Sequence, residues 1–130
     1  MIKKKEFTYR GKTLEELKAL DVREFAKILK SKNRRNVLRN FQEIEEFISR
    51  SKEKIEQNKR IKTHKRTLVI VPQMIDMKIQ VHKGNSFVPV EITGEMLGHK
   101  LGEFALTRSK IKHSKAGVGA TKGTKHKSKK

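Results

Sequence analysis

The sequence has no cysteine and no tryptophan, only two prolines, and less than half as many acidic as basic residues. Without cysteine the chain can hold neither a disulfide framework nor a thiolate zinc site, a composition that fits a cytoplasmic protein. No apolar run approaches the roughly 20 residues that a membrane-spanning helix needs, so we expect no membrane association. Residues 1–6 are basic but lack a following apolar stretch, so they do not resemble a secretory signal.

Aromatic residues are also scarce. One tyrosine and six phenylalanines make up 5% of the chain, and the phenylalanines fall mostly at positions expected to be buried. The sequence therefore predicts no aromatic surface on which single-stranded bases could stack. Hydrophobic residues account for 34% of the chain, which allows a modest core but not one that includes all 130 residues. Part of the chain is expected to become ordered only on a partner.

Positive charge is abundant. The chain holds 33 Lys and Arg against 14 Asp and Glu, a formal net charge of +19, and its pI is near 10.4. Such an excess destabilises a free compact protein through self-repulsion, which favours a working state against a polyanion. Nucleic acid, an anionic membrane surface and an acidic protein are the candidate partners.

The charge is unevenly distributed. Residues 67–107 contain four acids and three bases, a net charge of −1, so the rest of the chain carries +20. We predict three parts: a helical basic N-terminal extension at 1–61, an α+β core at 62–107, and a basic flexible tail at 108–130. The tail has eight lysines, one arginine and no acid, and it cannot bury enough apolar surface to fold alone.

The predicted extension contains three possible helix starts. Thr13, Asp21 and Asn40 are each followed three residues later by glutamate, the signature of a capping box. Apolar residues at helical spacing follow each of these positions. A basic stretch, residues 30–39, separates the second predicted helix from the third.

The predicted core is rich in β-branched and apolar residues. Residues 68–71 form a short apolar run that Pro72 ends, which predicts a strand. Residues 77–81 alternate apolar with polar, 83–86 predict a turn, and 87–92 predict the returning strand. Pro89 within that strand favours an edge position, and residues 93–101 predict a short helix capped by Thr93. The predicted class is α+β, a small antiparallel sheet with packed helices, a helical N-terminal extension and a disordered basic C-terminal tail.

Several motifs resemble one family. KGN at residues 83–85 and LGHKLGEFALT at 97–107 resemble the signature of the small-subunit ribosomal protein nineteen family. KTHKR at 62–66 and FVPVEI at 87–92 are similar to it too, while FTYRGK at 7–12 and KHSKAGVGAT at 112–121 resemble its archaeal and eukaryotic branch. The likeness extends more loosely over nearly the whole chain, although residues 40–60 match no pattern.

The resemblance implies a structural role in translation. Members of this family bind ribosomal RNA in the head of the small subunit, beside the small-subunit ribosomal protein thirteen family. Their tail points toward the region that holds transfer RNA, near the decoding centre in eukaryotes. The resemblance thus implies a cytoplasmic, ribosome-bound protein with no cofactor, and we expect no self-association.

Candidate RNA-binding residues are the cations that could meet phosphate. Arginine pairs with phosphate bidentately, and lysine supplies a mobile point charge. We expect recognition of RNA shape and backbone, with little reading of bases. The candidates form four groups: Arg34, Arg35 and Arg39; Lys59, Arg60, Lys62, His64, Lys65 and Arg66; Lys83, His99 and Lys100; and Arg108, Lys110, Lys112 and His113.

Catalytic and metal sites are not predicted. The five histidines form no HxxxH or HExxH pair, and no thiolate is present. Glu103 is expected to be a structural carboxylate paired with Lys100 or Arg108, because no nucleophile or phosphate-binding loop accompanies it. For Gly98 and Gly102, turn geometry and close approach to RNA are equally favoured, whereas Gly84 favours turn geometry.

Two other classes of protein share part of this composition. A chromatin-like architectural protein would share the lysine-rich tail and bind duplex DNA without sequence preference, but charge alone does not account for the segment from Gly98 to Arg108. A basic RNA-processing enzyme would need clustered carboxylates or paired histidines, and the sequence offers neither. The sequence therefore predicts a non-enzymatic ribosomal protein.

Overall fold

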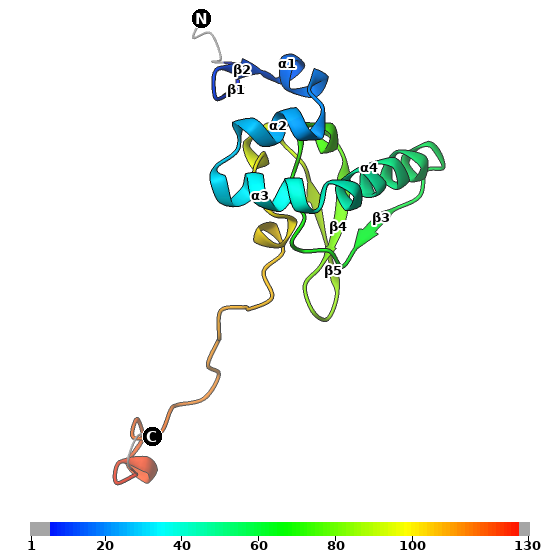
Figure 1. Ribbon diagram of the computed structural model, residues 1–130. Helices are drawn as coiled ribbons and strands as arrows, with labels where there is room; N and C mark the ends of the chain where they lie inside the picture. Colours follow the sequence, from blue (N-terminus) through cyan, green and yellow to red (C-terminus); the bar gives the residue numbers. More distant parts are fainter. Residues whose placement is uncertain (1–5, 128–130) are drawn as a thin grey trace, which may run out of the picture.

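The computed structural model of this chain describes residues 6–127 (Figure 1). The first five residues of the predicted extension and the last three of the predicted tail lie outside the described residues. We call residues 6–105 the body and residues 106–127 the tail. The body contains a short hairpin, four helices and a three-stranded sheet, so the predicted α+β class is confirmed.

The chain enters the body through a hairpin that the sequence did not predict. Strands β1 (Thr8–Tyr9) and β2 (Lys12–Thr13) pair antiparallel around Arg10 and Gly11, whose φ angles are 49° and 81°. Two successive positive φ values are typical of the tightest hairpin turns. Helix α1 (Leu14–Ala19) follows directly, and Thr13 caps it as predicted: its hydroxyl accepts from the Glu16 amide, and its own amide donates to the Glu16 carboxylate at 3.0 Å.

Three longer helices follow: α2 (Val22–Ile28), α3 (Ser31–Arg39) and α4 (Phe41–Glu56). The starts predicted at Asp21 and Asn40 are confirmed in position. The Asp21 amide donates to the Glu24 carboxylate at 3.2 Å, but the Asn40 side chain donates to Asn36 Oδ1 at 3.3 Å and makes no cap. The basic stretch at 30–39 is itself helical and forms α3.

The sheet has the strand order β3-β4-β5, formed by β3 (Ile61–Thr63), β4 (Lys78–His82) and β5 (Phe87–Glu91). The predicted β4–β5 hairpin is confirmed, and Pro89 lies on the edge strand as expected. The sheet is mixed rather than wholly antiparallel, because β3 runs parallel to β4. Residues 64–77, which include the 3-10 turn η1 (Pro72–Met74), connect β3 to β4 and return the chain to the same end of the sheet, which permits parallel pairing.

Residues 68–71 are not a strand of this sheet, contrary to the prediction. They are extended and almost fully buried, with a single bridge between Val69 and Lys100. The Ile70 amide donates to the His99 carbonyl at 2.8 Å, and the Gly98 amide donates to the Ile70 carbonyl at 3.1 Å. A continuous apolar run indicates a segment that is buried on both faces, but the run does not indicate which other segment will pair with it.

The helix predicted at 93–101 is replaced by two 3-10 turns, η2 (Gly94–Met96) and η3 (Leu101–Phe104). Between them Gly98 has a φ of +78°, and a Cβ there would lie 2.9 Å from the Tyr9 hydroxyl and 3.0 Å from Leu29 Cδ2. The helix cannot continue through this position because its backbone bonds go to Ile70 instead. Packing within the protein therefore explains the glycine, without contact with RNA.

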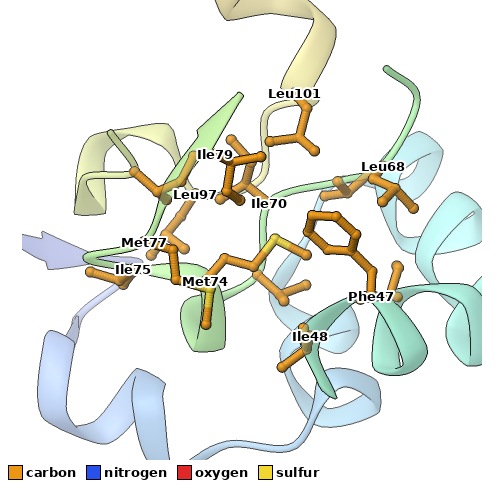
Figure 2. Close-up of a cluster of buried hydrophobic side chains, with 14 of the residues drawn as sticks. Phe47, Ile48, Leu68, Ile70, Met74, Ile75, Met77, Ile79, Leu97 and Leu101 are labelled. Carbon is orange, nitrogen blue, oxygen red and sulfur yellow. The ribbon is translucent and has the colours of Figure 1, made fainter. Parts of the chain in front are cut away.

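One buried cluster runs from Leu17 to Ala105 and includes residues of α1, α2, α3, α4 and the sheet. Figure 2 shows part of it, where Phe47 and Ile48 of α4 lie beside Leu68, Ile70 and Met74. Burying a side chain of this size stabilises the fold by about 1.5–3 kcal/mol. The cluster crosses the boundary predicted at residue 61, so helices and sheet share one core.

The tail leaves the body as an extended segment (Figure 1). Each of its residues is exposed except Gly119 and Thr124, which are half-buried, and a 3-10 turn, η4 (Lys122–Thr124), lies near its end. Leu106 and Ile111 are 74% and 75% exposed. The predicted absence of a core is thus confirmed for residues 108–127. No helix within residues 6–127 combines the length and the apolar character needed to cross a membrane.

Candidate nucleic-acid interface

Arg35, Arg39 and Lys100 come together in one hollow. Arg35 and Arg39 are four residues apart on α3, so their side chains share a helix face. Lys100 reaches the same place through its bridge to Val69, which holds the η3 segment against the body. The hollow has a volume of about 290 Å³, and we call it the α3 hollow; its lining residues are Lys32, Arg35, Asn36, Arg39, Asn40 and Lys100.

Arg34, predicted to join this group, turns the other way. Its guanidinium donates to the carbonyls of Ala26 (3.3 Å), Lys27 (3.0 Å) and Leu29 (3.1 Å). The last carbonyls of a helix have no partner within the helix, so a nearby cation satisfies them and complements the helix dipole. Arg34 therefore joins α3 to the end of α2, and its donors face the protein's own backbone.

A second cationic groove lies between α4 and β3. Lys65 Nζ lies 2.7 Å from the Glu43 carboxylate, and Arg50 pairs with Glu46 at 3.2 Å. The groove has a volume of about 280 Å³, and we call it the α4–β3 groove; its lining residues include Glu46, Arg50, Lys54, Lys62, His64 and Lys65. The predicted Lys62, His64 and Lys65, which lie in β3 or directly after it, are thus gathered in this groove.

Lys59 and Arg60 were predicted to belong to the same surface as Lys62, but they line a different hollow. This hollow has a volume of about 410 Å³ and also includes Lys78 and Asp76. Ile61, between Arg60 and Lys62, is buried. The chain therefore passes from this hollow to the α4–β3 groove as it enters the sheet. Asp76 pairs with Lys18 at 2.9 Å, which brings a carboxylate beside these cations.

Arg66 is directed inward, although it was predicted to face RNA. Its guanidinium donates to the carbonyl of His82 and to the carbonyls of Gly102 (2.8 Å) and Ala105 (2.6 Å). Gly102 lies against it, since a Cβ there would be 3.0 Å from both Arg66 Cβ and its carbonyl oxygen. Arg66 therefore joins the end of β4 to η3, and Gly102 packs against Arg66.

The third predicted group is divided. Lys83, at the β4–β5 turn, lines a hollow of about 290 Å³ with Leu106, Thr107 and Ser109 at the start of the tail. The turn forms at Gly84, whose φ is +108° with open space around it, so turn geometry accounts for this glycine. The hairpin turn and the first tail residues therefore border one hollow, while Lys100 belongs to the α3 hollow.

His99 and Glu103 form a side-chain hydrogen bond that the sequence did not predict. The His99 Nδ1 atom lies 2.7 Å from Glu103 Oε2, and Glu103 Oε1 accepts from the Lys100 amide at 3.3 Å. Glu103 is thus a structural carboxylate, as predicted, but its side-chain partner is His99 and not Lys100 or Arg108. The pair is on the surface of the η3 turn.

The predicted tail cations, Arg108, Lys110, Lys112 and His113, are all exposed. None of them has an ion-pair partner in the part of the chain that the structure describes. The charges of Arg108, Lys110 and Lys112 are therefore available to an outside anion.

Some site residues were missed. Arg50 and Lys54 are four apart on α4, a spacing that places them on one face, but only the fold turns that face toward β3. Lys32 and Lys78 carried no distinguishing signal in the sequence.

An aromatic cluster was also missed. The rings of His64 and His82 lie 4.2 Å apart, and Phe87 contacts both at 5.2 and 4.9 Å between ring centroids. We call these three side chains the ring cluster. Within residues 6–127 no three side chains of His, Cys, Asp and Glu gather closely enough to hold a metal ion.

The fold and the site together describe a small basic α+β protein with several cationic hollows and a cationic tail. Comparison with known proteins identifies its family. The model of the family described as "Ribosomal protein S19" matches residues 3–113. The small ribosomal subunit protein uS19 of Methanocella arvoryzae is 43% identical over 124 residues, which cover 95% of this chain and 87% of that relative.

The chain therefore belongs to the ribosomal protein S19 family. This confirms the resemblance found in its motifs and places it among structural ribosomal proteins, not enzymes.

Proposed function

We propose that this chain is a structural constituent of the small ribosomal subunit that binds ribosomal RNA in the subunit head. The observation that carries the proposal is the α3 hollow. Three Lys and Arg side chains of α3 meet Lys100, more than 60 residues away in sequence, and no carboxylate lines the hollow. Four cations beside two amides match a folded phosphate backbone.

The mode of binding follows from the kinds of side chain present. Arginine forks and lysine ammonium groups contact phosphate, so most of the affinity is electrostatic and independent of base sequence. The hollows lie on different elements of a rigid body, so they meet RNA that has a defined fold. Recognition of RNA shape is therefore the main mode of binding.

The proposed surroundings come from the family. The small-subunit ribosomal protein thirteen family is the proposed protein neighbour, and the tail is proposed to extend toward transfer RNA and the decoding region. The exposed, unpaired cations of the tail support contact with an extended polyanion. The cytoplasm is the proposed compartment, as for the ribosome itself.

Sedimentation tests the assembly. We expect the chain to migrate with small subunits and whole ribosomes on a sucrose gradient of native lysate at near-physiological salt. A chain that stays at the top, or sediments with DNA, would contradict the proposal.

A pair of variants tests the α3 hollow. Arg35→Gln with Arg39→Gln should lower affinity for transcribed small-subunit ribosomal RNA several-fold. It should also reduce the slope of log affinity against log salt by an amount that corresponds to about two phosphate contacts. The matched control, Lys27→Gln with Lys52→Gln, removes two exposed positive charges that line none of the hollows described above. Equal losses in both variants would show that net charge alone matters and would exclude the α3 hollow as a specific contact.

A further inference from the structure

We infer that the ring cluster of His64, His82 and Phe87 is a stacking site for one unpaired base of the bound RNA. This inference rests on the proposed function and extends it, because shape recognition alone needs no aromatic surface. It departs from the expectation, drawn from the scarcity of aromatic residues, that the chain has no such surface. Two of the three rings are imidazoles, which a count of Phe, Tyr and Trp omits.

The strand register brings the three rings together. His82 and Phe87 are direct partners in the antiparallel β4–β5 pair. Thr63 is the register partner of Val81 in the parallel β3–β4 pair, so His64 leaves β3 beside His82. The cluster thus lies where the end of β3 meets the β4–β5 hairpin (Figure 1).

The ring geometry leaves one end of the stack open. The His64 and His82 rings are in close, tilted contact, with centroids 4.2 Å apart and planes 35° from parallel. Phe87 is almost perpendicular to both and nearly equidistant, at 5.2 and 4.9 Å, so it lies at the side of the pair and not at its end. His64 is exposed while the other two rings are half-buried. The outer face of His64 can therefore take a base as the next member of the stack.

His82, against which His64 lies, is held in place before any ligand arrives. The Gly84 amide donates to His82 Nδ1 at 3.2 Å, which fixes the ring orientation and requires that nitrogen to be unprotonated. Arg66 holds the His82 carbonyl through its own bonds to the backbone. A site that is already ordered loses little conformational entropy on binding, which favours affinity.

Cations for the attached phosphates lie beside the rings. His64 is part of the lining of the α4–β3 groove, where Arg50, Lys54, Lys62 and Lys65 outnumber the single carboxylate of Glu46. The Lys62 ammonium lies 5.3 Å from the Phe87 centroid, a cation–π contact that holds this charge next to the cluster. A base on His64 with its phosphates in the groove is the nucleotide arrangement that this surface fits.

Two variants of His64 test the inference with full-length protein and transcribed small-subunit ribosomal RNA. His64→Ala removes the outer ring and should weaken binding about tenfold, the size typical of one stacked base. His64→Phe keeps a flat ring without the imidazole nitrogens and should bind within about twofold of the unmodified protein. The thermal unfolding midpoint of each variant checks that the fold is retained.

The salt dependence separates stacking from charge. Loss of a stacked base leaves the slope of log affinity against log salt unchanged, whereas the control Lys65→Ala should lower it by about one phosphate contact. Unchanged affinity in His64→Ala, or equal weakness of His64→Ala and His64→Phe, would overturn the stacking site. If the unmodified protein itself fails to bind the RNA, the proposed function fails first, and the two failures are thereby distinguished.

Discussion

The body and the tail are both basic, but their cations have different surroundings. In the body Arg34 and Arg66 donate to backbone carbonyls, and Lys65 and Arg50 pair with glutamates. In the described tail no cation has an acidic partner, and no residue is buried. The body thus satisfies part of its own positive charge, while the tail leaves all of its charge to an outside partner.

The difference shows that counting basic residues overestimates the positive charge that is available to an outside partner. Arg34 and Arg35 are neighbours in one basic helix, yet one holds the fold and the other lines a hollow. The same holds for Arg66 and Lys65, which follow each other after β3. In the body, neighbouring cations can have opposite roles because helix and strand geometry point them in different directions.

The largest expected effect is the loss of Arg66. Arg66 is half-buried, and its guanidinium donates to three backbone carbonyls. Arg66→Ala leaves those carbonyls without their donor, so we expect the free energy of unfolding to fall by about 3 kcal/mol. Urea denaturation measures this as a lower midpoint. Exchanging Lys65 and Arg66 together for glutamate would therefore disturb the fold as well as any RNA contact.

Arg60→Ala is the matched control for Arg66. Arg60 is exposed and donates no side-chain hydrogen bond to the described residues. We expect its urea midpoint to stay close to that of the unmodified chain. If Arg66→Ala shifted the midpoint no more than Arg60→Ala, the structural role assigned to Arg66 would be wrong.

Removal of the tail should leave the stability nearly unchanged but weaken the binding of RNA. A chain that ends at residue 107 should unfold within about 0.5 kcal/mol of the full chain, because the lost residues make no core. Its affinity for small-subunit ribosomal RNA should drop about tenfold or more at physiological salt, with a shallower salt dependence. Binding that survives truncation unchanged would mean that the body supplies all contacts with RNA.

A smaller effect is expected at Arg34, which bridges α3 and the end of α2. Arg34→Ala should lower the free energy of unfolding by about 1 kcal/mol, since the side chain is exposed and water can replace its donors. Arg35→Ala, one position along the same helix, is the control and should leave stability nearly unchanged. Equal stability of the two variants would remove the distinction between inward and outward cations in α3.

The local features were predictable from the sequence. The capping box at Thr13, the helix starts at Asp21 and Asn40, the β4–β5 hairpin and the edge position of Pro89 each depend on residues close in sequence. Capping, alternation and proline geometry act over a few residues, so a short pattern carries the full signal. The family resemblance, too, came from short motifs.

Features that need distant partners were missed or misplaced. Strand β3 was not predicted, because it lies in a basic stretch and its pairing depends on the distant strand β4. Residues 68–71 and 93–101 were assigned to a strand and a helix, but their backbones bond to each other and form neither. In each case a tertiary contact overrides the local propensity.

In the candidate site, too, local patterns were predictable and contacts between distant segments were not. The sequence by itself determined that the protein is basic, where acids are absent, and which family its motifs resemble, since composition and short motifs need no fold. Only the tertiary structure decided that Arg34 and Arg66 donate to the protein's own carbonyls, that Arg35, Arg39 and Lys100 share a hollow, and that two histidines cluster with Phe87. Side-chain direction depends on helix face and strand register, and these are fixed only when distant segments pack together.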